Sequence, residues 1–79
     1  MELSVTMTQA LAVKAALSAQ ATVLYAKDGN DPTKVGIISL LDPKAGQMLL
    51  RWANANDAPT VAAFLAQVPA AVEVADITG

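Results

Sequence analysis

The clearest hydrophobic pattern in the chain predicts a hairpin of two strands over about residues 35–53. Residues 35–41 form a nearly unbroken apolar run that is rich in branched side chains and too short for an ordinary helix, which is typical of a strand buried on both faces. Residues 42–46, DPKAG, then combine turn formers, and Gly46 can take the left-handed conformation that closes a tight loop. Gly36 interrupts the first strand, where a glycine usually marks a bulge or a close approach of the backbone.

The second strand of this hairpin alternates between two faces, because side chains in a strand have a period of two. One face receives Met48, Leu50 and Trp52, and the other receives Gln47, Leu49, Arg51 and Ala53. Arg51 is therefore expected at a partly covered surface. Trp52 suits a core position and an interface anchor equally well, because tryptophan is seldom fully buried and is enriched at interfaces.

The N-terminal residues predict a half-buried strand. In residues 3–7, LSVTM, the alternation places Leu3, Val5 and Met7 on one face. Such a strand can pair within its own fold or be added to the sheet of a neighbour. The pattern leaves both possibilities open.

A helix and a second strand are predicted between this segment and the hairpin. Residues 8–20 are alanine-rich with Thr8 as a candidate N-cap, so we expect a helix, although the narrow apolar stripe also fits an extended arm. Residues 21–26, ATVLYA, hold β-favouring residues and predict a strand. Residues 27–32 are a dense cluster of turn formers and predict a loop.

The C-terminal part predicts an amphipathic helix and a closing segment. Asp57 can cap the helix, with Pro59 in its first turn, where a missing N–H costs nothing. The apolar face, spaced i, i+3, i+4 and i+7, consists of Val61, Phe64, Leu65 and Val68. Pro69 ends the helix, and residues 71–77 are expected to form a closing strand or a docked tail. Together these patterns predict an α+β fold: one small β-rich domain over residues 1–79, with a mostly antiparallel sheet and one or two short helices.

Composition adds an expectation about the surface. Apolar residues make up 54% of the chain but aromatic residues only 4%, and much of the difference is alanine, which buries little area. Only 15% of residues are charged, and the mean hydropathy is +0.44. We therefore expect a thin core and an uncharged, apolar exterior that meets a protein partner.

Several classes of function are disfavoured by residue content. The chain has no cysteine and no histidine, so disulfides and the common nitrogen or sulfur metal sites are excluded. The net charge is −2 and the basic residues are scattered, which argues against nucleic-acid binding. No apolar run reaches the ~20 residues that cross a bilayer. The start, with Glu2 and alternating polar residues, does not resemble a signal peptide, so we expect a protein made in the cytoplasm and kept or packaged there.

No group of residues predicts catalysis. Asp28, Asp31 and Asp42 could ligate a hard cation, but they lack the spacing of a calcium loop and suit turns better. Serines such as Ser39 have only lysines as candidate bases and lie in no recognisable motif. We expect no enzyme activity and no cofactor.

Residues 28–41, DGNDPTKVGIISLL, resemble a segment of lambda-type phage head decoration proteins. In that family a strand ends in an Asp-Gly turn, a short polar loop follows, and a Val-Gly-Ile-aliphatic strand comes next. The residues that carry the resemblance are Asp28, Gly29, Val35, Gly36, Ile37 and Ile38. The resemblance implies a compact β-rich virion protein that binds the major capsid protein as an oligomer, and it covers about a quarter of the chain.

A second resemblance links residues 34–65 to the later half of histidine-phosphocarrier proteins, but this chain has no histidine to carry phosphate. The sequence therefore predicts a non-enzymatic capsid decoration or cement protein at the virion surface, with a homo-oligomer and the major capsid protein as partners. The alternative is a small cytosolic regulatory module that binds one protein. The candidate partner-binding residues are Leu3, Val5, Met7, Arg51 and Trp52.

Overall fold

The computed structural model describes residues 2–17 and 20–77, with the backbone alone described for residues 2, 3 and 15–17. The elements along the chain are β1 (Glu2–Val5), α1 (Met7–Leu17), β2 (Thr22–Lys27), β3 (Val35–Asp42), β4 (Gly46–Trp52), the 3-10 turn η1 (Ala55–Asp57), α2 (Val61–Gln67) and β5 (Val72–Glu73). The predicted α+β fold is confirmed.

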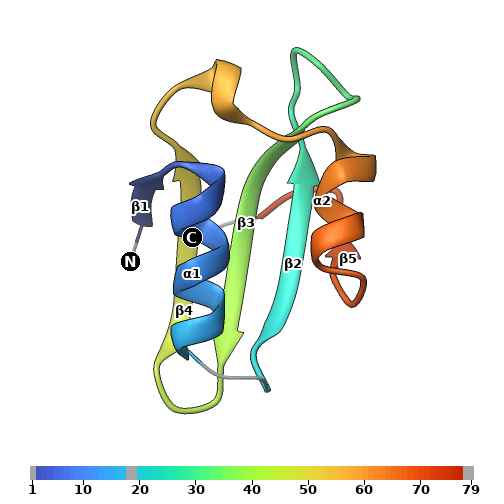
Figure 1. The fold of residues 1–79 in the computed structure, drawn as a ribbon. Helices are drawn as coiled ribbons and strands as arrows, with labels where there is room; N and C mark the ends of the chain where they lie inside the picture. Colours follow the sequence, from blue (N-terminus) through green and yellow to red (C-terminus); the bar gives the residue numbers. More distant parts are fainter. Residues whose placement is uncertain (1, 18–19, 78–79) are drawn as a thin grey trace.

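The five strands form one sheet in the order β1-β4-β3-β2-β5. The pairs β2–β3 and β3–β4 are antiparallel, whereas the two outer strands are parallel to their neighbours. Both helices pack on the same face of the sheet (Figure 1). The opposite face, which we call the second face, has no helix over it in the described part of the chain.

The central hairpin follows the predicted pattern. β3 is the middle strand and is buried along nearly its whole length. Gly46 closes the turn with a φ of +84°, and the Asp42 carboxylate accepts the Lys44 and Ala45 N–H groups at 2.7 and 2.9 Å. Opposite β2, the register shifts between Ala26 and Lys27 so that Gly36 is bypassed, which is the predicted bulge.

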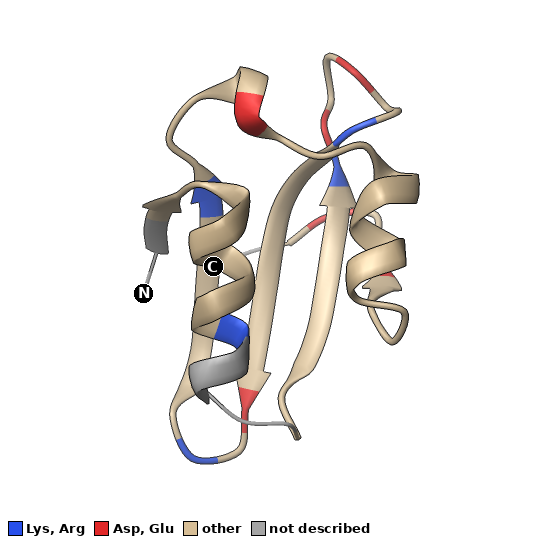
Figure 2. Cartoon of the chain, in the orientation of Figure 1, with Lys and Arg blue, Asp and Glu red and all other residues tan. Residues whose placement is uncertain are grey.

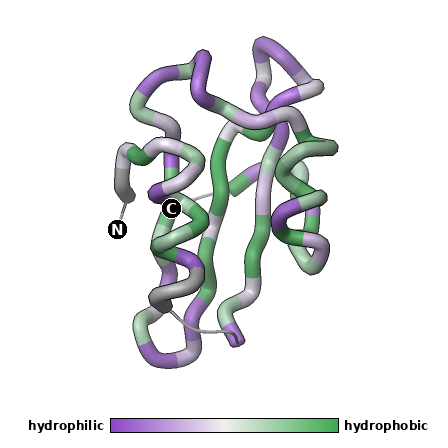
Figure 3. Tube along the Cα trace, in the orientation of Figure 1, coloured by the Kyte–Doolittle hydropathy of each residue, from purple (hydrophilic) through white to green (hydrophobic). Residues whose placement is uncertain are grey.

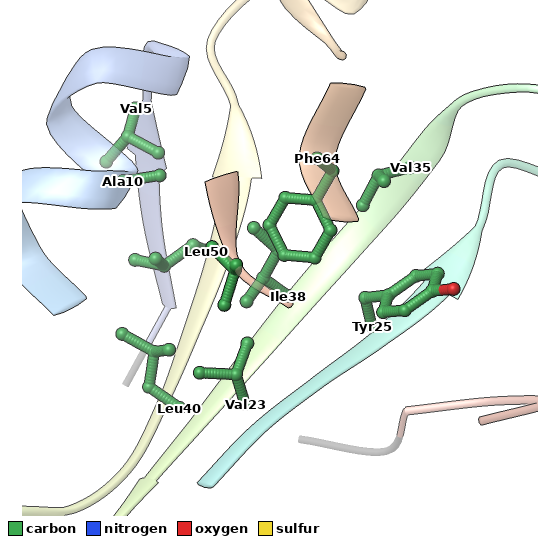
Figure 4. Close-up of a cluster of buried hydrophobic side chains, with 10 residues drawn as sticks. Val5, Ala10, Val23, Tyr25, Val35, Ile38, Leu40, Leu50 and Phe64 are labelled. Carbon is green, nitrogen blue, oxygen red and sulfur yellow. The ribbon is translucent and has the colours of Figure 1, made fainter. Parts of the chain in front are cut away.

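The main core lies between the helices and the sheet. Its buried side chains converge from both layers (Figure 4) and are Val5, Ala10, Val23, Tyr25, Val35, Ile38, Leu40, Leu50, Phe64 and Val68. Phe64 is 1% exposed and meets Tyr25 edge to face, with ring centroids 5.4 Å apart. Hydrophobic residues concentrate on the central strands, whereas the loops at both ends of the sheet are hydrophilic (Figure 3). The apolar face predicted for α2 is therefore the face that packs on the core.

Three local predictions were wrong, each because a neighbouring residue caps the element better. Met7 begins α1 instead of ending a strand, since Thr6 accepts the Gln9 N–H while the Gln9 side chain accepts the Thr6 N–H. Thr8 is therefore not the cap. α2 is capped by Thr60 through the Ala63 N–H, so Asp57 lies in the preceding 3-10 turn and Pro59 precedes the helix.

The structure also decides two alternatives that the pattern left open. β1 pairs with β4 over four residues, so this strand belongs to the sheet of its own chain and is not added to the sheet of a neighbouring molecule. Residues 7–17 are helical, so the extended arm is wrong for them, and residues 18 and 19 lie outside the described part of the chain.

Candidate functional site

The second face of the sheet is the face that neither α1 nor α2 covers (Figure 1). Strand register places alternate side chains there, in rows that run across the sheet. The residues of this face on the described strands include Leu24, Ala26, Ile37, Ser39, Leu41, Gln47, Leu49, Arg51 and Val72. Ala26, Ile37 and Leu49 form a small hydrophobic cluster of their own, which we call the second-face cluster.

One short segment crosses this face. After β5, the Val74 N–H donates to the Tyr25 carbonyl on β2, and Ile77 then packs against the second-face cluster, which reaches β4. Residues 74–77, which we call the tail, therefore run from β2 across β3 toward β4, behind the sheet as drawn in Figure 1. The cluster is only 6–7% exposed as a result.

Beside the tail, the second face retains exposed aliphatic surface. Val72 is 52% exposed and is the only large hydrophobic residue that is mostly open to solvent among those described. Its register partner Leu24 and the diagonally placed Leu41 are half-buried. The exposed area of large hydrophobic side chains is therefore smaller than the composition of the chain suggested, because most exposed apolar residues are alanines. These are Ala12, Ala45, Ala53, Ala55, Ala62, Ala63, Ala66, Ala70 and Ala75.

A pocket of about 280 Å³ lies between the tail and the sheet. Its lining combines the apolar Ile37 with charged residues: Lys27 and Arg51 are basic, and Asp28 and Asp76 are acidic. The remaining lining residues are Ala26, Gly29, Gly36, Ala75 and Ile77. Most of the surface that this lining exposes belongs to polar groups, so the pocket suits a polar or charged part of a partner polypeptide, which the charges orient.

The five residues predicted to bind a partner do not meet on one surface. Val5 is 5% exposed within the core, and Met7 is partly buried in the first turn of α1. Arg51 and Trp52 point to opposite sides of the sheet because they are adjacent in β4. Trp52 packs against the main core, and Arg51 lines the pocket. The backbone of Leu3 pairs with that of Leu50 where β1 runs beside β4.

A polar cluster holds the start of the tail. The Tyr25 hydroxyl donates to Glu73 at 3.4 Å, and the same carboxylate oxygen lies 3.5 Å from the Lys27 ammonium. Burial, and then the nearby Glu73 charge, raise the pKa of Tyr25. The Lys27–Glu73 pair has about half its side-chain surface exposed on each side, so it holds β5 only weakly.

The remaining candidates for chemistry have structural roles. Ser39 is fully buried, and its hydroxyl accepts from the Gln47 amide at 2.9 Å. Asp28 accepts the Asn30 N–H at 2.8 Å, and Asp31 accepts both the N–H and the hydroxyl of Thr33, so both carboxylates organise the loop before β3. Across residues 2–17 and 20–77, no group of acidic side chains is placed to hold a metal ion. No helix in that part of the chain has the length and apolar character needed to cross a membrane.

Two features of this surface escaped the sequence reasoning. Lys27 and Asp76 come from distant segments and meet the pocket only because β5 pairs with β2. The second is the surface that Ile77 meets: the sequence placed this residue in a closing strand or a docked tail, and the structure shows that it docks on the second-face cluster.

Comparisons with models of protein families, with curated proteins and with solved structures found no match to this chain. No family is therefore assigned, and function is inferred from the residues and their arrangement.

Proposed function

We propose that this protein is a non-enzymatic binding module that docks through the second face of its sheet onto a larger protein assembly, and that the assembly is a phage capsid. In this role it is a decoration or cement protein that stabilises contacts between major capsid subunits.

The observation that carries the proposal is the unequal covering of the sheet. The face toward α1 and α2 is closed by a full hydrophobic layer, whereas the second face has a tail of four residues and the exposed Val72. A sheet that buries only one face normally presents polar side chains on the other. The aliphatic residues on this second face instead suit contact with another protein.

The charge distribution supports the same reading. Charged residues lie mainly in the loops and at strand ends, while α2 carries none (Figure 2). Around the exposed Val72 and the half-buried Leu24 and Leu41 on the second face, the neighbouring Thr22 and Gln47 are uncharged. Because few charges must be desolvated there, a protein partner can cover this area at low cost.

The choice of a capsid rests on the resemblance of residues 28–41 to the lambda-type decoration proteins. A chain of this size gains only about 3–5 kcal/mol from its own core. Docking on a shell would add stability to the folded state by mass action, because only the folded chain binds.

Sedimentation with capsids tests the proposal. Purified protein is centrifuged alone and with empty, expanded capsids of the phage that encodes it, and the pellet is assayed for both chains. We expect the protein to pellet only with capsids and to saturate at a fixed ratio to the major capsid protein. Protein that stays in the supernatant at all capsid concentrations would overturn the proposal.

A further inference from the structure

The tail gives the docking surface a second property. Among the described residues, Ile77 is the partly buried hydrophobic residue that packs against the second-face cluster, and the tail before it is joined to β2 by the hydrogen bond from the Val74 N–H to the Tyr25 carbonyl. The tail follows strand β5, which has only two residues. Within this strand, Glu73 forms an exposed ion pair with Lys27 and accepts a long hydrogen bond of 3.4 Å from the Tyr25 hydroxyl. A short edge strand with exposed contacts opens at low free energy compared with the central strands.

We infer that the tail occupies the docking surface as an internal competitor, and that an extended segment of the capsid subunit displaces it. This inference rests on the proposed function. The incoming segment would place an aliphatic side chain of the size of Ile77 on Ala26, Ile37 and Leu49.

The tail itself indicates the chemistry of the occupant. On its sheet side the pocket lining includes Lys27, which pairs with Glu73, together with Arg51 and Asp28. The tail brings Asp76 to this place directly before Ile77. A partner segment with a carboxylate followed by Ile, Leu or Val reproduces both features. It would add backbone contacts along the same path, as extended segments do when they bind beside a sheet.

The pocket supplies the space for this exchange. An open pocket of about 280 Å³ lies beside the tail, lined by Ala75–Ile77 and by residues of β2, β3 and β4. A better-packed segment can therefore gain contacts that the tail lacks.

The test compares two single-residue variants, of which only one loses the contact between the tail and the second-face cluster. Ile77→Ser removes the aliphatic contact of the tail, and Ala70→Ser is the control, because Ala70 is exposed and lies outside both the tail and the pocket lining. Circular dichroism and Trp52 fluorescence report whether each variant keeps its fold.

In the free protein, the inference predicts that Ile77→Ser binds several-fold more of an apolar dye such as anilinonaphthalene sulfonate than the wild type, while Ala70→Ser does not. With empty capsids, Ile77→Ser should bind several-fold more tightly than the wild type, because the competitor is weakened.

Weaker capsid binding by Ile77→Ser would overturn the inference, since the tail would then be part of the interface. Unchanged dye binding would overturn it too, because the tail would not shield the cluster. If neither the wild type nor any variant pellets with capsids, the capsid is not the partner, and displacement of the tail by a capsid segment is overturned as well. The dye result then shows separately whether the tail shields the second-face cluster.

Discussion

Gly36 lies where two backbones meet with no room for a side chain. A Cβ at this position would lie 3.0 Å from the Asp28 Cα and 3.1 Å from the Asp28 nitrogen, and backbone atoms cannot rotate away as a flexible side chain can. The bulge and the neighbouring Asp28 turn therefore depend on this glycine, which also lines the pocket.

We predict that Gly36→Ala destabilises the fold by about 1–3 kcal/mol, the usual cost of overpacking. Gly29→Ala is the matched control, since nothing lies within 4 Å of a Cβ there, and it should change stability by less than about 0.5 kcal/mol. Urea denaturation followed by Trp52 fluorescence measures both. Equal stability of the two variants would show that the bulge tolerates a methyl group.

Protonation of Asp42 makes the stability of the central turn depend on pH. Hydrogen bonds from the Ala45 and Lys44 N–H groups lower the pKa of Asp42 below its ordinary value, and those from the Thr33 side chain and N–H do the same for Asp31. A carboxyl group with a lowered pKa stabilises the fold above its ordinary pKa, which is about 3.9. That stability is lost as the pH falls through the lowered value, because the unfolded chain takes up the proton first.

The free energy of unfolding should therefore decrease as the pH falls below about 4. Asp42→Asn should show a weaker decrease, and the double variant with Asp31→Asn the weakest. Denaturation midpoints between neutral pH and pH 2.5 would check this order. A decrease as steep in the double variant as in the wild type would mean that other carboxyl groups cause it.

At the scale of elements, the capping residues fix where the helices begin. Thr6 and Gln9 satisfy each other's N–H groups at 3.2 and 3.0 Å, so α1 starts directly after β1 and turns back over the sheet. This reversal makes β1 an edge strand that pairs with β4.

We predict that Thr6→Ala costs about 1 kcal/mol of stability, as the loss of an N-cap typically does. Thr8→Ala should cost less, because Thr8 is exposed within the first turn and is not the cap. Thermal and chemical denaturation of both variants would compare them. A larger loss in Thr8→Ala would place the helix start two residues later than in the structure.

The elements show which parts of the fold the sequence could predict. The hairpin, the bulge at Gly36 and the apolar face of α2 follow from local patterns, since periodicity and turn chemistry act over a few residues. The caps were misplaced because Thr6, Thr8, Asp57 and Thr60 are all acceptable caps locally, and the sequence pattern does not show which of them accepts an N–H. No local sequence signal predicts the parallel pairing of β1 with β4 or of β5 with β2.

At the scale of the whole molecule, the same limit applies to the candidate site. Arg51 was predicted at a partly covered surface, and it lines the pocket. Val5 and Trp52 were candidates for the partner, but the register directs both toward the core, because they are paired across β1 and β4 on the side of the helices. The contact of the tail with three strands depends on the tertiary structure, which the pattern of one strand does not contain.

Capsid binding by two charge variants tests the central claim most directly. Val72→Asp places a charge on the exposed residue of the second face, and Ala62→Asp places the same charge on the outer side of α2, where Ala62 is also exposed. Both positions are open to solvent, so we expect both proteins to fold. Docking through the second face predicts that Val72→Asp no longer sediments with empty capsids while Ala62→Asp binds like the wild type. Loss of binding by Ala62→Asp with full binding by Val72→Asp would contradict it.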